Sequence, residues 1–260
     1  MSIIVKDVSF SYGEGTVLNQ VSFQVEEGQL LVVLGPNGVG KSTLFRCMLG
    51  LLNNYSGQIS ISGEDIRQMG SRKLAKLIAY VPQYHYPSFN FSVSDMVLMG
   101  TSALVGGLST PGKEQIAQVD AALKKLNIYN LRDRGYTHIS GGERQLALIA
   151  RALVQNAKTL IMDEPTANLD YGNQLKIMTQ IKQLTHEGYS IVLSTHNPDH
   201  AFWFSDQILA LSAGQVLAKG APRQVMDSGL IQKLYGAKVN IESLNNDSIR
   251  ICVPCLSDPC

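Results

Sequence analysis

The chain has 260 residues, of which 45% are hydrophobic and 17% are charged, and its formal net charge is +1. This composition suits a globular protein that buries a full core, and a balanced charge without a basic stripe argues against nucleic-acid binding. The longest apolar runs, such as residues 30–34, are much shorter than a membrane span, and no signal peptide is evident. We therefore expect a cytosolic protein that reaches a membrane only through a partner protein.

Two kinds of strand are expected along the chain, and they differ in the spacing of their apolar residues. Apolar and polar residues alternate in three segments, which predicts half-buried strands of an antiparallel layer: 3–10, 17–25 and 58–62. Continuous apolar runs predict central strands of a parallel sheet that is covered on both faces: 30–34, 159–162 and 191–194. Each of these last runs ends at polar or glycine residues, at the edge where open α/β sheets bind ligands.

The middle of the chain, from about residue 90 to 155, has a helical pattern. Ser92 and Ser94 are N-cap candidates for a helix over the apolar residues that follow. The glycine- and serine-rich segment 100–112 predicts a loop. A second helix is predicted by an amphipathic stripe of Ile116, Val119, Leu123 and Leu126. We interpret this region as a helical subdomain inserted into an α/β core.

The chain becomes polar from about residue 236, so we expect a main domain over residues 1–235 and a small appendage over 236–260. Three of the four cysteines lie there, at Cys252, Cys255 and Cys260. A C-x2-C pair can bind a metal ion, but zinc sites normally need a second pair with similar spacing. A terminal strand without a metal is the favoured interpretation, and the role of these cysteines stays open.

The sequence GPNGVGKST, residues 35–43, matches the phosphate-binding pattern G-x-x-x-x-G-K-[ST] between an expected strand and an expected helix. Its glycines allow consecutive backbone N–H groups to surround a phosphate. Lys41 then reaches the β- and γ-phosphate oxygens, and the Ser42 hydroxyl is a ligand for Mg²⁺. A nucleotide site is therefore predicted at Gly35, Pro36, Asn37, Gly38, Val39, Gly40, Lys41, Ser42 and Thr43.

The segment TLIMDEPTANLD, residues 159–170, predicts a buried strand that ends in two acidic residues. Asp163 stands where a carboxylate can hold the hydration shell of Mg²⁺. Glu164 is placed to polarise the water that attacks the γ-phosphate. Two acids at a solvated strand end are the alternative, but their occurrence together with a phosphate loop favours the catalytic interpretation.

The phosphate loop, the sequence SGGE at 140–143 and the sequence LIMDEPTANLD follow one another in an order that resembles the ATP-binding subunit of an ABC transporter. The resemblance covers about residues 1–235. It implies an α/β fold: a P-loop NTPase core with a parallel central sheet, an antiparallel β subdomain and an inserted helical subdomain. It also implies an enzyme that binds ATP and Mg²⁺ and couples ATP hydrolysis to transport.

The same resemblance implies roles for four further residues. Tyr12 matches the aromatic residue that stacks on adenine, and Gln83 matches the glutamine that contacts Mg²⁺ and the attacking water. His196 matches the switch histidine that contacts the γ-phosphate, and Asp170 matches the acid that bridges two subunits. Each position has a plain structural alternative, but four coincident matches favour the functional interpretation.

The run HISGGERQLALIARAL, residues 138–153, predicts a glycine turn that opens a helix, which is an anion site without a lysine. In the family that the chain resembles, two subunits close head to tail, and each ATP lies between one phosphate loop and the partner's SGG turn. The resemblance thus implies that Ser140, Gly141, Gly142 and Glu143 serve an ATP bound to a partner subunit. A homodimer is expected, and pairing with a paralogue is the alternative that stays open. The family's usual LSGGQ is ISGGE here; the Glu143 side chain is free to point to solvent, and no loss of activity is inferred.

Integral membrane permease subunits are further implied partners, docked at the helical subdomain and the Gln83 loop, on the cytoplasmic face of the cell membrane. The aromatic residues of segment 84–91 either form that docking groove or pack the hinge of the subdomain. Both interpretations stay open at this point.

The segments 91–100, 169–174 and 196–226 resemble importers of iron–siderophore, haem, cobalamin and related metal complexes, which take their substrate from an extracytoplasmic binding protein. Gly100-Thr101 departs from the Gly-Arg pair that is frequent in that group of importers. The transported substrate cannot be identified from the residues of this subunit, because it does not contact them. An exporter subunit is the alternative, and a non-transport ABC ATPase is a more distant one.

Overall fold

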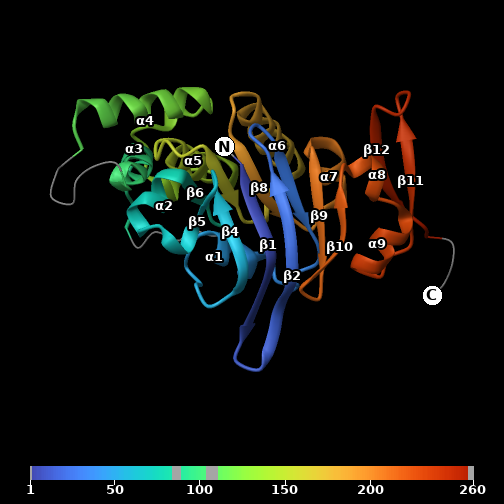
Figure 1. Ribbon diagram of the computed structural model, residues 1–260. Helices are drawn as coiled ribbons and strands as arrows, with labels where there is room; N and C mark the ends of the chain where they lie inside the picture. Colours follow the sequence, from blue (N-terminus) through green and yellow to red (C-terminus); the bar gives the residue numbers. More distant parts are fainter. Residues whose placement is uncertain (1, 84–88, 104–110, 257–260) are drawn as a thin grey trace.

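The computed structural model describes residues 2–83, 89–103 and 111–256 (Figure 1). An antiparallel sheet covers one side of the core, and within the described residues its strand order is β2-β1-β4-β5. Its strands are β1 (Ile3–Tyr12), β2 (Gly15–Val25), β4 (Ser56–Ile61) and β5 (Glu64–Asp65). The three alternating segments therefore form one antiparallel layer, as their spacing predicts.

The central sheet has the order β10-β9-β3-β8-β7-β6 in the described part of the chain. Its strands are β3 (Leu30–Leu34), β6 (Ile78–Val81), β7 (Thr159–Met162), β8 (Ser190–Thr195), β9 (Gln207–Ser212) and β10 (Gln215–Gly220). All neighbours pair in parallel except β10, which pairs antiparallel to β9. The three continuous apolar runs are β3, β8 and β7, which lie side by side, so their polar carboxyl ends meet at one edge.

Both faces of the central sheet are covered, which explains why its strands are apolar without interruption. Inward residues of β1, β2 and β4 pack with helix α1 (Lys41–Met48) against one face. Helices α5 (Gly141–Leu153), α6 (Tyr171–His186) and α9 (Ser228–Tyr235) bury apolar residues in the core on the other face. Smaller elements complete this part: η1 (Ile66–Gln68), α2 (Ser71–Leu77), α7 (Pro198–Phe204) and α8 (Pro222–Val225).

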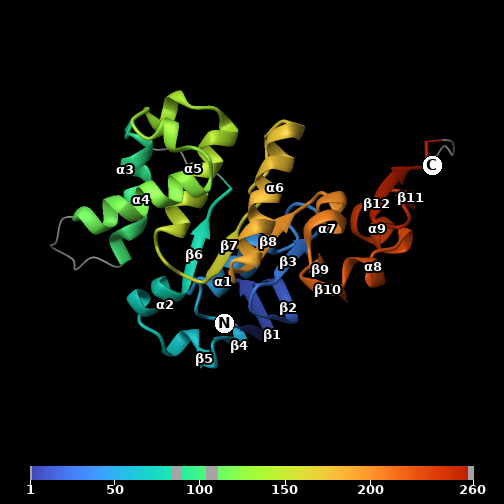
Figure 2. The same cartoon turned by 90° about the horizontal axis from the view of Figure 1, so that it is seen from above.

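Helices α3 (Val93–Leu98), α4 (Lys113–Lys125) and α5 gather at one end of the molecule, as Figures 1 and 2 show. Short 3₁₀ turns join them: η2 (Met99–Ala103), η3 (Tyr129–Leu131) and η4 (Tyr136–His138). Ser92 is the N-cap of α3, since its hydroxyl accepts a hydrogen bond from the Asp95 N–H. The predicted stripe of α4 is wrong at one position: Ile116 is exposed near the start of the helix, where the described elements do not cover it. Of the predicted loop 100–112, residues 104–110 lie outside the described part.

The end of the described chain is a hairpin of β11 (Val239–Leu244) and β12 (Ile249–Pro254), which forms its own sheet. Figure 1 places it at the end of the molecule opposite α3 and α4. Strand β12 packs on α7: the Cys252 N–H donates to Asp199 Oδ1 at 2.9 Å, and Trp203 Nε1 donates to the Arg250 carbonyl at 2.8 Å. The limit of the main domain at residue 235 stays a prediction.

Cys252 and Cys255 are free thiols, and burial raises the pKa of Cys252 to about 12. Among the residues that the structure describes, no cluster of three His, Cys, Asp or Glu side chains is arranged to hold a metal ion. Cys260 lies outside them. No helix within the described ranges is both long and apolar enough to cross a bilayer.

Candidate functional site

The loop between β3 and α1 has the backbone shape that a phosphate requires. Gly38 and Gly40 have φ values of +83° and +107°, which side-chain-bearing residues rarely adopt. A Cβ atom on Gly40 would also lie 2.9 Å from the Val17 carbonyl oxygen, so the close approach of β2 needs a glycine there. A glycine-rich turn of this kind at the start of a helix allows successive N–H groups to surround an anion, which is the predicted role of this loop.

Lys41 opens α1 and is only 5% exposed. Its ammonium group donates to the Gly35 carbonyl at 2.7 Å and lies 3.2 Å from Glu164 Oε1. A buried cation needs such partners, because the loss of its hydration is costly. The charge is therefore held at the mouth of the phosphate loop, next to the carboxylate that ends β7.

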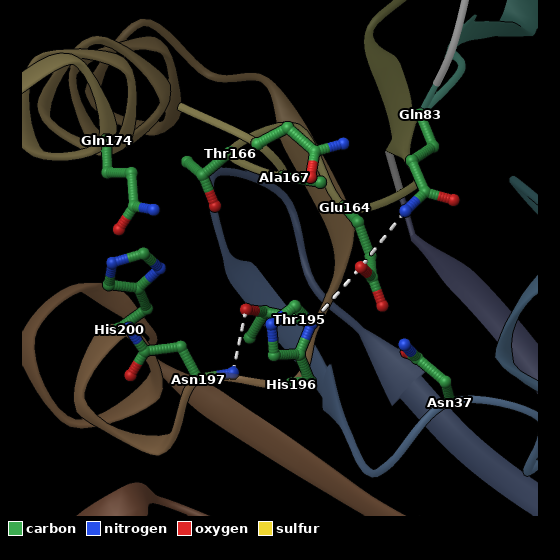
Figure 3. Close-up of a pocket in the computed structure, with 11 residues that line it drawn as sticks. Asn37, Gln83, Glu164, Thr166, Ala167, Gln174, Thr195, His196, Asn197 and His200 are labelled. Carbon is green, nitrogen blue, oxygen red and sulfur yellow. Dashed lines mark hydrogen bonds and ion pairs between the residues drawn. The ribbon is translucent and has the colours of Figure 1, made fainter. Parts of the chain in front are cut away.

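Three side chains from separate elements converge on Glu164, as Figure 3 shows for two of them. Gln83, after β6, donates from Nε2 to Glu164 Oε2 at 3.2 Å, and His196, after β8, places Nδ1 3.1 Å from the same oxygen. Lys41 contacts the other oxygen. An ionised carboxylate only accepts hydrogen bonds, so Nδ1 carries the hydrogen in this contact. The carboxylate is thus oriented on both sides, in a largely buried position.

The backbone of Glu164 is also unusual, with φ at +44°. A side-chain-bearing residue adopts this left-handed region only when its surroundings enforce it, and such residues concentrate at functional sites. Ser194 supplies the constraint: the Glu164 N–H donates to its hydroxyl at 2.9 Å, and the hydroxyl donates to Asp163 Oδ1 at 2.6 Å. Sequence reasoning missed Ser194, although it lies near the polar end of β8.

Two adjoining cavities lie at this edge of the sheet. One, of about 400 Å³, is lined by Val17, Asn37, Gly38, Gly40, Lys41, Ser42, Thr43, Gln83 and Glu164. The other, of about 200 Å³, shares Asn37, Gln83 and Glu164 with it and extends past His196 to Gln174 and His200 (Figure 3). The structure therefore brings together most of the predicted phosphate loop, Gln83, Glu164 and His196.

Tyr12 is not among the described residues that line either cavity. It is 49% exposed near the tip of the β1–β2 hairpin, and its ring packs edge-on against Phe10 at 4.7 Å between centroids. Val17, which sequence reasoning did not select, lines the phosphate-loop cavity instead. The adenine-stacking role of Tyr12 stays a prediction.

The SGG turn belongs to a second group of predicted residues. Ser140 is the N-cap of α5 and forms a capping box with Glu143: the Ser140 N–H donates to Glu143 Oε2 at 2.8 Å, and the Glu143 N–H donates to the Ser140 hydroxyl at 3.3 Å. Hydrogen bonds that the carboxylate accepts from Ser140 lower the pKa of Glu143. The Glu143 carboxylate therefore has a backbone donor at the start of the helix, where the side chain stays partly exposed to solvent.

Asp170 lies in this second group, at the start of α6. Its carboxylate accepts hydrogen bonds from the Asn173 backbone and side chain, which lower its pKa. A Cβ atom on Gly142 would lie 2.6 Å from Asn173 Oδ1, so the turn packs closely on α6 and a larger residue would displace the Asn173 side chain. In the described residues, the SGG turn and Asp170 line neither of the two cavities around the phosphate loop.

The capping box makes the effect of Glu143→Gln predictable. A glutamine oxygen accepts the same hydrogen bond from the Ser140 N–H, so the helix start is retained. We expect ATP turnover to stay within about twofold of the unmodified protein, since an exposed neutral hydrogen bond replaces a charge-assisted one. Steady-state ATPase measurements check this. A much larger gain or loss would mean that the charge of Glu143 acts on the nucleotide itself.

A largely parallel sheet whose carboxyl ends carry a G-x-x-x-x-G-K-[ST] loop and two adjacent acidic residues is typical of a P-loop nucleotide-binding protein. The chain belongs to the ABC transporter family, since that family's model matches residues 18–167, more than half of the chain. It is accordingly an ATPase whose hydrolysis of ATP is coupled to transport, and subunits of this kind work with membrane permease components.

Two similar proteins and one solved structure support this assignment. An uncharacterised ABC transporter ATP-binding protein of Haemophilus influenzae is 38% identical over 248 residues, which cover 95% of this chain and 94% of that protein. A probable iron chelatin transport ATP-binding protein of Helicobacter pylori is 35% identical over 237 residues, covering 90% and 93%. The structure of a metal-chelate type ABC transporter in an inward-facing conformation matches with a TM-score of 0.88 and 30% identity, covering 98% of this chain and 97% of that one.

Proposed function

We propose that the chain is the ATP-hydrolysing subunit of an importer of metal complexes, and that Glu164 is its catalytic base. The observation that carries the catalytic assignment is the convergence of Lys41, Gln83 and His196 on this carboxylate. The metal-complex substrate is supported by the iron chelatin and metal-chelate transporters among the similar proteins.

In this mechanism the phosphate loop and Lys41 hold the β- and γ-phosphates, while Glu164 takes a proton from a water molecule. The oxygen of that water bonds to the γ-phosphorus as the bond to the ADP oxygen breaks. His196 and Gln83 keep the carboxylate oriented, because each contacts Oε2. Orientation of this kind accelerates a reaction without requiring the protein to rearrange during the chemical step.

The residues near the phosphate loop fit Mg²⁺, which prefers oxygen ligands and is usually held by few protein groups together with phosphates. Ser42 offers an exposed hydroxyl, and Asp163 offers the oxygen that does not bond to Ser194. Gln83 binds Glu164 through its nitrogen, which leaves its oxygen available to a cation. When bound, the ion would neutralise charge on the phosphates.

A head-to-tail homodimer is proposed because the two groups of predicted residues stand apart in one chain. The SGG turn packs beside α6, whereas the phosphate loop opens into a different cavity. An ATP bound in that cavity would therefore meet Ser140 and its neighbours only from a second copy of the chain. Asp170, at the start of α6, is proposed to contact the partner in the same closed state.

A permease helix is proposed to dock in a cavity of about 460 Å³ between the end of α1 and α2. Its lining includes the apolar residues Leu49, Leu51 and Leu74, and Leu51 is largely exposed. Tyr80 on β6 also lines this cavity. Because Tyr80 precedes Gln83 by only three residues, a helix docked in the cavity would contact the chain close to the catalytic glutamine. Phe89 and Phe91 are exposed and pack edge-to-face at 6.0 Å, while residues 84–88 lie outside the described part.

The subunit is proposed to work on the cytoplasmic face of the cell membrane, since ATP is supplied there. An extracytoplasmic binding protein would deliver the substrate to the permease and contact this chain only through it. The exporter alternative shares every catalytic motif and differs only in the docking region and in the permease.

Affinity purification of tagged Glu164→Gln from its native host, in mild detergent with ATP, tests the proposal. A large separate permease should co-purify, and reconstituted complexes should hydrolyse ATP faster when a metal-chelate-loaded binding protein is added. The phosphate-loop variant Lys41→Ala is the control for ATP-dependent assembly. An exporter-type permease, or stimulation by a substrate added on the cytoplasmic side, would contradict the importer assignment.

A further inference from the structure

The cavity beside His196 ends at a histidine that the catalytic mechanism does not use. His200, on α7, is 1% exposed, and neither of its ring nitrogens has a hydrogen-bond partner among the described residues. Buried polar groups in proteins are nearly always hydrogen-bonded, so such a side chain calls for an explanation. The group to identify is the hydrogen-bond partner of the His200 ring.

Gln174 lines the same cavity from the first turn of α6. Its amide nitrogen donates to the Leu169 carbonyl at 2.9 Å, which fixes the orientation of the carboxamide. The carboxamide oxygen is then the free end, and Figure 3 shows it pointing toward the ring of His200. The Gln174 carboxamide oxygen and the unpartnered ring of His200 therefore face each other across the cavity.

Packing alone does not explain why this position holds a histidine. The ring of His200 lies 6.4 Å from those of Trp203 and Phe204, contacts that a phenylalanine would make equally well. Burial lowers the pKa of His200, and this outweighs Asp199, which favours the charged form; His196 disfavours it further. The ring is accordingly neutral near neutral pH and carries one N–H donor.

We propose that His200 is a positioning residue: when the subunits close on ATP, its ring N–H donates to the Gln174 carboxamide oxygen, a hydrogen bond that this structure does not contain. That bond would couple the subunit's own ATP site to the SGG turn that serves the ATP of the partner. The inference rests on the proposed function. On one side, α7 begins two residues after His196, with Asn197 as its N-cap. On the other side, Gln174 holds the carbonyl of Leu169, in the loop that precedes Asp170.

Leu169 extends the connection to the second group of site residues. A Cβ atom on Gly141 would lie 3.2 Å from Leu169 Cδ2, so this side chain lies against the SGG turn. The switch histidine faces the ATP of its own subunit, whereas the SGG turn is proposed to face the ATP of the partner. A connection through His200, Gln174 and Leu169 would therefore let each nucleotide affect the other.

The test compares His200→Phe, His200→Gln, Gln174→Met and the His200→Phe/Gln174→Met double variant in the full chain. His200→Phe retains the ring packing but removes the donor, and we expect kcat to fall roughly fivefold, as for one hydrogen bond. The KM for ATP should stay within about twofold, and the Hill coefficient for ATP should fall toward one. His200→Gln, which keeps a donor, should recover most of kcat and of the cooperativity.

The double variant separates coupling from independent damage. If the two side chains act as one unit, it should be no slower than the slower single variant; two independent effects would multiply. His186→Phe, at an exposed end of α6, is the matched control, and thermal unfolding should show that all variants fold.

The coupling role would be overturned if His200→Phe left kcat and the Hill coefficient unchanged. It would also be overturned if the loss of kcat in the double variant equalled the product of the two single losses. A failure of His200→Gln to recover activity would do the same. These outcomes differ from failure of the proposed function, in which the unmodified protein itself would hydrolyse ATP no faster than Lys41→Ala.

Discussion

Replacement of Glu164 by glutamine is expected to lower ATP turnover by about 100-fold to 10,000-fold, the range in which a general base contributes. The amide keeps the shape of the side chain but cannot take a proton from water. ATP binding should persist, because the phosphate loop and Lys41 are unchanged, and the ATP-bound closed dimer should accumulate. Single-turnover kinetics and size-exclusion chromatography with ATP measure the two effects separately.

Glu187→Gln is the matched control, because Glu187 is exposed at the far end of α6 and pairs only with Lys125 among the described residues. It should leave turnover unchanged. Normal hydrolysis by Glu164→Gln would show that another group removes the proton. Loss of ATP binding in that variant would instead indicate that the contact between Glu164 and Lys41 is needed to shape the loop.

Replacement of Lys41 by alanine is expected to weaken ATP binding by at least about 30-fold, since losing one member of a buried charge pair costs roughly 2 kcal/mol or more. The ammonium group lies at the mouth of the phosphate loop, and of the described lysines and arginines Lys41 alone lines that cavity. Without it the γ-phosphate would face Glu164 with no intervening positive charge. Calorimetric titration with ATP measures the change in affinity.

Lys219→Ala on the exposed side of β10 is the control for the loss of one positive charge. A second variant, Lys41→Met, keeps much of the side-chain volume and tests whether a fall in affinity reflects charge instead of a cavity. Retained full turnover in both Lys41 variants would remove the basis for assigning this loop as the ATP site.

Contiguous motifs account for the part of the site that could be predicted from the sequence. The phosphate loop, the Asp163–Glu164 pair and the SGG turn are each short runs whose chemistry depends on local backbone shape. Their strands could be recognised because a parallel sheet covered on both faces needs uninterrupted apolar residues. Hence the layers of the fold were predicted correctly, and the carboxyl ends of β3, β7 and β8 meet at the edge where the site is predicted.

Several elements were not predicted. Strands β6, β9 and β10 were missed, although β9 lies inside the central sheet and carries a buried apolar run. The exposed residue Ile116 fits a helical stripe that no described element covers at that point. The attachment of the β11–β12 hairpin to α7, through Asp199 and Trp203, depends on contacts about 50 residues apart. Local spacing carries no information about such contacts.

The sequence by itself determined what kind of protein this is: its motifs, in their order, specify a P-loop ATPase of the ABC transporter family. Only the tertiary structure decided how the parts meet. It brought Ser194 between Asp163 and Glu164, set Val17 instead of Tyr12 against the phosphate loop, and faced His200 toward Gln174. The physical reason is that these contacts join residues far apart in the chain, so their geometry follows from strand order and helix packing, which no single segment encodes.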